Sequence, residues 1–410
     1  MINKKKLIYI FILVLITSCS FDNKTGIWNA GKKERERLSK LEEEQRQIIS
    51  STKVYSSENT FSKEISFNNV INLSKPKQNS SWEMSGLNYQ NFLGNIFLPN
   101  IDNIFLKKKI GKNKFSITKI VSAPLVTESS IILSDNRGII FNISHTGKIK
   151  WKKNIYKKIH KKIYKNLVFS IYENNLYIAD NIGFIYALDL NDGKLIWIKN
   201  HGIPLKSNIK IFNNKIFLIN QDNRILCLDS KSGSKIWDIR SVSSFIKSQN
   251  FLSLALSKKG NVVVLNSSGD LFKADGKDGK IYWSLNISSS MLVDATDFFK
   301  SSEIVIGNNE IIFSAGSSIF SYNLNRGVIN WEQELTSIGA PIIDGKNIFL
   351  VTGNGYFIIM NKDTGEIISS NNILKILKKK KQKTKVTGFI MGSGKIYSMT
   401  LNGYLIVSSA

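Results

Sequence analysis

The segment NIGFIYALDLNDGKLIW, residues 181–197, predicts two β-strands joined by a tight turn. Phe184, Tyr186 and Leu188 alternate with the residues at 185, 187 and 189. This is the two-residue period of a strand with distinct faces. The turn residues Asn-Asp-Gly end at Gly193, and glycine tolerates a positive φ while Asn and Asp bond their own backbone. Trp197 follows that glycine by four residues. One such hairpin is common, and its recurrence predicts the fold.

Five glycine turns in the chain are each followed, four residues later, by a tryptophan. The pairs are Gly147 and Trp151, Gly193 and Trp197, Gly233 and Trp237, Gly279 and Trp283, and Gly327 and Trp331. A sixth turn, at Gly365, has Ser369 at the tryptophan position. These glycines recur every 38 to 48 residues, and a period near forty that holds four short strands is typical of β-propeller blades. We therefore interpret the tryptophans as packing between blades.

Six blade-like units precede a shorter final segment. They span about 118–155, 166–201, 207–241, 250–286, 299–335 and 339–371. Residues 386–410 hold only three candidate strands, and a ring must close on itself to remove its sheet edges. We expect residues 103–109 to supply the missing outer strand. The prediction is an all-β propeller domain over 61–410 with seven four-stranded blades, or eight if 51–100 contributes one.

The first residues predict a targeting signal. Three lysines at 4–6 precede the apolar run 7–16, which is too short to span a bilayer. The sequence ITSC, ending at Cys19, resembles a bacterial lipobox, which implies a signal peptide over 1–18 and acylation of Cys19, including palmitate. An ordinary secretory signal with a coincidental cysteine is the alternative. Ser20 is not aspartate, and by resemblance to lipoprotein sorting this favours the periplasmic face of the outer membrane.

Residues 19–60 are polar and predict a lipidated tether. The mixed-charge run 32–47 favours a solvated, partly helical segment over a partner-binding helix. Two basic runs, 152–165 and 374–385, fall between blades and predict loops that are either solvated or in contact with acidic lipid head groups or an acidic partner. The net charge of +26 arises from lysines spread along the whole chain, so we expect no nucleic-acid partner.

No catalytic or metal-binding motif is present in the sequence. The three histidines are His145, His160 and His201, and none has metal-ligand spacing. Three turn acids recur with the repeat, which indicates a structural role: Asp192, Asp278 and Asp363. Cys227 lies in a strand pattern and predicts a small buried hydrophobe. We expect no enzyme activity, no metal and no cofactor.

The repeat A-x-D-x-x-x-G-x-x-x-W, complete at Ala187, Asp189, Gly193 and Trp197, resembles the quinoprotein (PQQ-type) propeller repeat. The resemblance covers roughly 104–410. With this repeat, the lipobox and no other domain, the chain resembles the BamB family. Its members are propeller lipoproteins of the outer-membrane β-barrel assembly (BAM) machinery. Members of that family usually have eight blades, one more than the seven counted here.

This resemblance implies a non-enzymatic periplasmic scaffold that binds the POTRA domains of the barrel subunit BamA. It also implies help in the folding and insertion of unfolded outer-membrane proteins, with β-augmentation as a possible mode. The loops that match the family's partner-binding loops hold Phe245, Ile246, Lys247, Met291, Leu292, Asp294 and Asp297. Ordinary connecting loops are the alternative interpretation of both stretches. Lys247 stands where the family pattern has arginine, and lysine cannot form arginine's bidentate fork.

Two other functions share this repeat or fold. The first is a PQQ-dependent dehydrogenase. For such an enzyme the family resemblance implies a calcium site, a catalytic aspartate and a disulfide between adjacent cysteines. The only cysteines here are Cys19 and Cys227, which argues against the enzyme. A propeller that binds polysaccharide or another periplasmic ligand remains open, because fold does not fix function.

Overall fold

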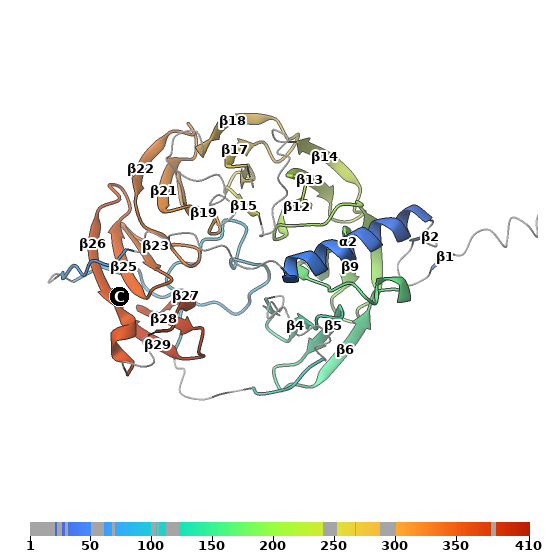
Figure 1. Cartoon of the computed structure of the whole chain (residues 1–410), viewed down its shortest axis with the longest axis horizontal. Coiled ribbons are helices and arrows are strands. Elements are labelled where there is room, and N and C mark those ends of the chain that lie inside the picture. Colours follow the sequence, from blue (N-terminus) through green and yellow to red (C-terminus); the bar gives the residue numbers. More distant parts are fainter. Residues whose placement is uncertain are drawn as a thin grey trace, which may run out of the picture.

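Seven antiparallel sheets are arranged in a ring around a central axis (Figure 1). The computed structural model describes residues 21–22, 27–28, 32–50, 61–67, 70–99, 104, 106–111, 123–240, 252–266, 268–287, 301–378 and 383–410. Within each sheet the strands follow chain order from the inner to the outer edge. The predicted all-β propeller is confirmed.

The first four blades have four strands each. Blade 1 is β3 (Leu125–Val126), β4 (Ile131–Ser134), β5 (Ile139–Ile143) and β6 (Ile149–Asn154). Blade 2 is β7 (Leu167–Tyr172), β8 (Asn175–Asp180), β9 (Phe184–Asp189) and β10 (Leu195–Asn200). Blade 3 is β11 (Lys210–Phe212), β12 (Lys215–Ile219), β13 (Arg224–Asp229) and β14 (Lys235–Arg240). Blade 4 is β15 (Ser253–Leu256), β16 (Val262–Leu265), β17 (Asp270–Ala274) and β18 (Ile281–Asn286).

The last three blades follow the same order, and short helices lie outside the sheets. Blade 5 is β19 (Val305–Ile306), β20 (Glu310–Ala315), β21 (Ser318–Asn323) and β22 (Ile329–Gln333). Blade 6 is β23 (Ile342–Asp344), β24 (Asn347–Val351), β25 (Tyr356–Asn361) and β26 (Ile367–Asn372). Blade 7 is β27 (Val386–Gly392), β28 (Lys395–Thr400) and β29 (Leu405–Ser409). The other elements are β1 (Phe21–Asp22), β2 (Ile27–Trp28), α2 (Lys32–Ser50), η1 (Lys158–His160) and η4 (Ile373–Ile376).

Blades 1 to 6 dock onto one another through the repeated tryptophan and glycine. The ring of each tryptophan lies directly against the turn glycine of the next blade. If that glycine carried a Cβ atom, the Cβ would lie only 2.5 to 3.0 Å from the nearest ring atom. The contacting pairs are Trp151 and Gly193, Trp197 and Gly233, Trp237 and Gly279, Trp283 and Gly327, and Trp331 and Gly365. Each indole Nε1 also donates a hydrogen bond of 2.8 to 3.4 Å to a carbonyl of the same turn. The predicted packing role of the tryptophans is confirmed.

The predicted closing strand is the one correction to the ring. Among the described residues blade 7 has three strands, and residues 106–111 are in none of them. Instead, Leu106 and Lys108 contact Gly147, and Lys108 Nζ donates to the Gly147 carbonyl. The segment therefore packs by side chains at the place where a tryptophan lies in the five interfaces among blades 1 to 6. Residues 61–67 and 70–99 contain isolated bridges but no strand, so they add no eighth blade.

Blade 6 has an added segment along its outer edge. Ile65 and Ser370 exchange backbone hydrogen bonds of 3.0 and 2.9 Å, and Ser369 Oγ donates to the Ile65 carbonyl at 3.4 Å. The serine at this position, unlike the tryptophans before it, contacts the chain's own N-terminal segment.

The apolar core lies between neighbouring sheets. One buried cluster, for example, joins Tyr177 and Ile185 of blade 2 to Ile211, Leu218 and Leu226 of blade 3. Cys227 of β13 is fully buried, and burial raises the pKa of its thiol to about 12. The prediction of a small buried hydrophobe is confirmed.

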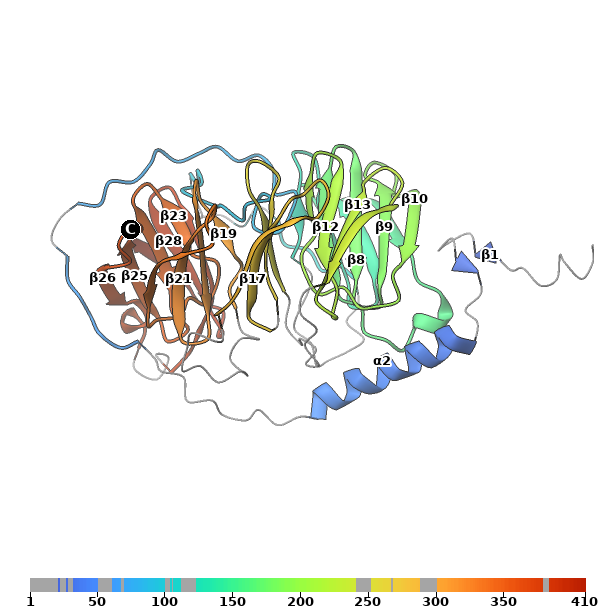
Figure 2. The ribbon, with the colours of Figure 1, turned by 90° about the horizontal axis from the view of Figure 1, so that it is seen from above.

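The ring has two distinct faces. Because the strands alternate in direction, the glycine turns lie on one face, which we call the turn face. The connections between blades lie on the other, which we call the loop face. Figure 2 shows the segment that precedes blade 1 above the ring and α2 below it. The helix falls within the range expected to be a solvated tether. That expectation is wrong at Leu38, which is buried in the apolar cluster shared by blades 1 and 2.

Candidate functional site: the centre and the loop face

Residues 82–98, which we call the channel segment, run along the centre of the ring (Figure 1). The segment contacts the innermost part of all seven blades in chain order. The contacts in that order are Trp82 with Val126, Glu83 with Ile171, Ser85 with Lys210, Tyr89 with Leu256, Gln90 with Ile306, Phe92 with the cluster around Ile343, and Ile96 with Gly392 and Ser393. The centre of the ring is therefore occupied by the protein's own chain at the turn-face ends of the inner strands.

A fully buried lysine fixes the channel segment to blade 3. Lys210 Nζ donates to the carbonyls of Ser85 at 2.5 Å and Asn88 at 2.9 Å, and to Asn91 Oδ1 at 2.5 Å. Burial lowers the pKa of Lys210 to about 8, against a smaller opposing effect of Glu303. Three oxygens around one ammonium compensate for only part of its loss of water, since the pKa stays below that of a free lysine.

Asn91 extends this lock to two further blades. Its Nδ2 donates to the carbonyls of Leu254 at 3.1 Å and Ile304 at 2.8 Å. Asn91 has a positive φ of 56°, and a Cβ at Gly86 would lie 2.2 Å from its Oδ1. The tight approach therefore requires glycine at position 86. Blades 3, 4 and 5 all meet at this one side chain.

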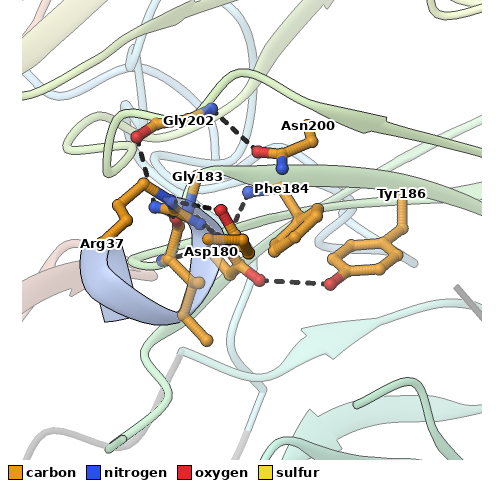
Figure 3. Close-up of polar contacts among 9 residues, drawn as sticks. Arg37, Asp180, Gly183, Phe184, Tyr186, Asn200 and Gly202 are labelled. Carbon is orange, nitrogen blue, oxygen red and sulfur yellow. Dashed lines mark hydrogen bonds and ion pairs between the residues drawn. The ribbon is translucent and has the colours of Figure 1, made fainter. Parts of the chain in front are cut away.

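On the loop face, α2 docks onto blade 2 (Figure 3). Arg37 Nη1 donates to the carbonyls of Ile182 at 2.5 Å and Gly202 at 3.2 Å. Glu34, one helical turn earlier, accepts two hydrogen bonds from the same guanidinium at 2.7 and 2.8 Å. Leu38 is 4% exposed. One face of the helix is thus part of the propeller's packing.

A buried carboxylate shapes the turn that receives Arg37. Asp180 Oδ1 accepts the backbone N–H groups of Ile182, Gly183 and Phe184 at 2.8 to 2.9 Å. Its Oδ2 accepts the hydroxyls of Tyr156 and Tyr186. Burial raises the pKa of Asp180, while these hydrogen bonds oppose the shift. The arrangement is structural, because all of its oxygens are used in holding the turn.

His160 lies beneath the helix in the same cluster. Its ring makes edge contacts with Tyr156 and Phe184, and its Nδ1 is buried without a hydrogen-bond partner in the described structure. Burial lowers the pKa of His160 to about 4, with a further contribution from Lys165. The imidazole is therefore neutral at physiological pH and acts as packing.

The remaining candidate residues have different outcomes. The proposed partner-binding residues Phe245, Ile246, Lys247, Met291, Leu292, Asp294 and Asp297 lie outside the described residues, as does Cys19. In the part of the chain that the structure describes, no group of His, Cys, Asp or Glu is placed to hold a metal. The turn acids Asp192 and Asp278 accept backbone N–H groups within their own turns, as their repetition predicts.

Sequence reasoning missed the channel segment and the docking of α2. The only local signals were Trp82 and the glycines at 86 and 94, both of which have positive φ. For α2 the signal was weaker still, since Leu38 and Leu41 are the only apolar residues between positions 32 and 47. Neither pattern indicates where in the ring the segment binds.

Comparison with known families decides the relationship. A family model described as outer membrane protein assembly factor BamB matches residues 104–203 and 146–371, more than half of the chain. The chain belongs to this family. Within the described residues, no helix is both long and apolar enough to cross a membrane.

Relatives in the BamB family are distant in sequence. The BamB protein of Moranella endobia is 20% identical over 272 residues, which are 60% of this chain and 64% of that protein. The BamB protein of Yersinia pestis is 21% identical over 57% of this chain and 60% of its own length. The chain thus matches less than two thirds of the length of either relative.

Solved structures share the fold. The crystal structure of BamB from Moraxella catarrhalis has a TM-score of 0.53 at 14% identity and covers 71% of this chain and 96% of that one. A quinohemoprotein alcohol dehydrogenase from Comamonas testosteroni has a TM-score of 0.50 at 12% identity over 69% of this chain and 63% of its own. At such identities the likeness shows the propeller architecture alone.

Proposed function

We propose that this protein is a non-enzymatic scaffold lipoprotein of the outer-membrane β-barrel assembly machinery. In this role it binds the POTRA domains of a BamA-like barrel subunit and assists the folding and insertion of outer-membrane proteins. The observation that carries the proposal is the match of the BamB family model over more than half of the chain. The names of the curated relatives agree with this assignment.

The centre of the ring supports a scaffold over a ligand-binding enzyme. Propellers that act on small molecules use the space around the central axis. Here the channel segment lies on the inner strands, and Lys210 and Asn91 are engaged with it. The surfaces left to a partner are the loops of the two faces and the outer strand edges, which suit recognition of protein domains and of extended chains.

We place the protein on the periplasmic side of the outer membrane, held by acyl chains on Cys19. If this is correct, Cys19→Ala leaves the protein soluble or unprocessed, because several buried acyl chains are what hold a lipoprotein in the bilayer. Fractionation of membranes from cells that carry the variant tests the anchor. Unchanged membrane association of Cys19→Ala would refute it.

The partner-binding residues proposed are those of the two loops, Phe245 to Lys247 and Met291 to Asp297. Gentle solubilisation of outer membranes and purification of a tagged copy should recover the BamA-like subunit. Replacing Asp294 and Asp297 by lysine should weaken that interaction by roughly 1–3 kcal/mol if both lie in the interface.

A matched control makes this experiment specific. Glu173 and Glu366 are exposed acids in turns of the turn face, so Glu173→Lys with Glu366→Lys makes the same change in charge at sites outside the two loops. We expect the control to retain the barrel subunit. Equal retention by both double variants would exclude Asp294 and Asp297 from the interface, and recovery of the protein alone would contradict the scaffold function.

A further inference from the structure

A basic and apolar patch lies on the loop face between blades 6 and 7. Ile376, at the end of η4, is 76% exposed, and Leu401, in the turn between β28 and β29, is 64% exposed. Lys378, Lys383 and Lys385 have exposed side chains and lie in the connection from β26 to β27. We call these five residues the blade-7 patch. The run 374–385 contains no acidic residue.

The patch is held in place by the fold. Ile373 and Leu374 are buried, and Asn372 Oδ1 accepts the Leu374 N–H at 3.0 Å at the start of η4. The Leu401 N–H donates to the Lys385 carbonyl at 2.8 Å. Ile376 and Leu401 are thus presented to solvent by anchored backbone, so no ordering of these two residues is needed before they bind a surface.

Exposed aliphatic side chains among lysines suit one kind of surface in particular. Aliphatic tips enter the head-group boundary of a bilayer, while lysine stems extend along it and keep their ammonium groups among anionic head groups. Among the described residues, Lys378 and Lys383 form no ion pair with an acid of this chain. Their charges are therefore available to an external anion.

The other basic loop of the chain lies on the same face. The predicted loop 152–165 begins with the last three residues of β6, and its remainder, 155–165, connects blades 1 and 2. The whole run contains no acid, and α2 packs beside the connection on the loop face. The turn acids Asp192, Asp278 and Asp363 lie on the turn face, and the acids on the loop face include those of α2, of which Glu34 is paired with Arg37. The two most basic connections of the ring therefore point the same way.

We propose that the loop face docks onto an anionic membrane surface through the blade-7 patch, with Ile376 and Leu401 at the head-group boundary. The lipid anchor of the proposed function would place the same face near the bilayer, since α2 joins the loop face only thirteen residues after Cys19. For this orientation the inference rests on the proposed anchor, whereas the patch itself does not depend on it.

Hydrogen–deuterium exchange of the full chain on liposomes tests the inference. One set of liposomes is phosphatidylcholine alone, and the other is an equimolar mixture with phosphatidylglycerol. We expect amides of residues 373–378 and 383–386 to exchange several-fold more slowly on the anionic liposomes, with protection lost at high salt. Equal exchange on both surfaces would overturn the proposal.

Two double variants with matched charge make the test specific. Each lysine near an anionic surface contributes about a fivefold factor to binding, so Lys378→Gln with Lys383→Gln should abolish most of the protection. Lys346, in the turn between β23 and β24, and Lys395, the first residue of β28, are exposed at the turn face. Lys346→Gln with Lys395→Gln should leave the protection intact. Ile376→Ser should reduce protection without changing its salt dependence.

The remaining outcomes also discriminate. Loss of protection in both double variants would mean that the net charge of the protein alone drives its binding to anionic liposomes. That result would overturn the proposed role of the blade-7 patch. Protection that needs an added acidic outer-membrane protein would assign the patch to a protein partner and overturn the lipid proposal. Failure of neutral liposomes to retain the chain would refute the anchor at Cys19, while the anionic liposomes would still report on the patch.

Discussion

Trp197 of blade 2 lies so close to Gly233 of blade 3 that a Cβ on the glycine would come within 2.7 Å of the indole ring. The same indole donates a 2.9 Å hydrogen bond to the Ser230 carbonyl. A large apolar ring thus packs on a bare backbone while its one polar atom bonds the turn beside it. This relationship recurs at five interfaces and explains why glycine and tryptophan repeat together.

Gly233→Ala should destabilise the propeller by more than its backbone strain alone. Gly233 has a φ of +65°, which costs an alanine about 1 kcal/mol, and the clash with Trp197 should add about 1–3 kcal/mol. Gly345→Ala is the control, because Gly345 also has a positive φ of 60° but has open space around it. Urea unfolding of both variants measures the difference. Equal losses would contradict the packing role of the glycine.

Lys210 should make stability depend on pH in the alkaline range. Its pKa is about 8 in the folded protein against 10.5 for the free side chain, so between these values the unfolded chain binds more protons. Stability contributed by Lys210 should therefore rise as the pH increases through this window, by on the order of 1–3 kcal/mol. The free energy of unfolding of the native protein minus that of Lys210→Met, followed from pH 8 to 10.5, isolates this effect from the other lysines.

Lys210→Met should in addition loosen the channel segment. The variant removes the ammonium donor from Asn91 Oδ1 and from the carbonyls of Ser85 and Asn88. The Asn88 carbonyl keeps the Asn91 N–H at 3.2 Å, but each buried acceptor left unpaired costs about 1–3 kcal/mol. Hydrogen exchange at residues 82–98 should become faster than at the outer strands. A variant with unchanged exchange in this segment would show that Lys210 does not hold it.

His160 should make the packing under α2 sensitive to acid. Its pKa is about 4 in the folded protein and 6.5 when free, so its contribution to stability is present above pH 6.5 and is lost as the pH falls toward 4. The expected loss is on the order of 1–3 kcal/mol. His160→Phe, which keeps the ring contacts with Tyr156 and Phe184, should remove this dependence. Thermal unfolding of the native protein and of His160→Phe from pH 7 to 4 measures the effect. If the unfolding temperatures of the two proteins fall in parallel, His160 is not responsible.

Arg37→Gln should release α2 from blade 2 with little effect on the ring. The substitution removes the hydrogen bonds to the carbonyls of Ile182 and Gly202, each worth about 1.5–3 kcal/mol when the donor is charged. Limited proteolysis should then cut within residues 32–50 sooner. Arg35→Gln, on the exposed side of the same helix, is the control, and equal cleavage of the two variants would contradict the docking.

The sequence by itself determined the architecture of the ring. Strand periodicity, the glycine turns and the tryptophans at a fixed offset are local patterns, and their repetition placed six blades and the three strands of the seventh. Such patterns are reliable because every blade must solve the same packing problem against its neighbour. The structural role of the turn acids and the burial of Cys227 followed for the same reason.

Only the tertiary structure decided what fills the centre and what covers the loop face. The channel segment forms no regular element, and its partners, such as Lys210 and Ile304, are more than a hundred residues away. Residues 106–111 could have paired with β29, but they contact Gly147 by side chains instead. Long-range contacts of this kind leave no periodic pattern in a sequence. Each contact is made only once, by a segment that lies outside the blade repeats.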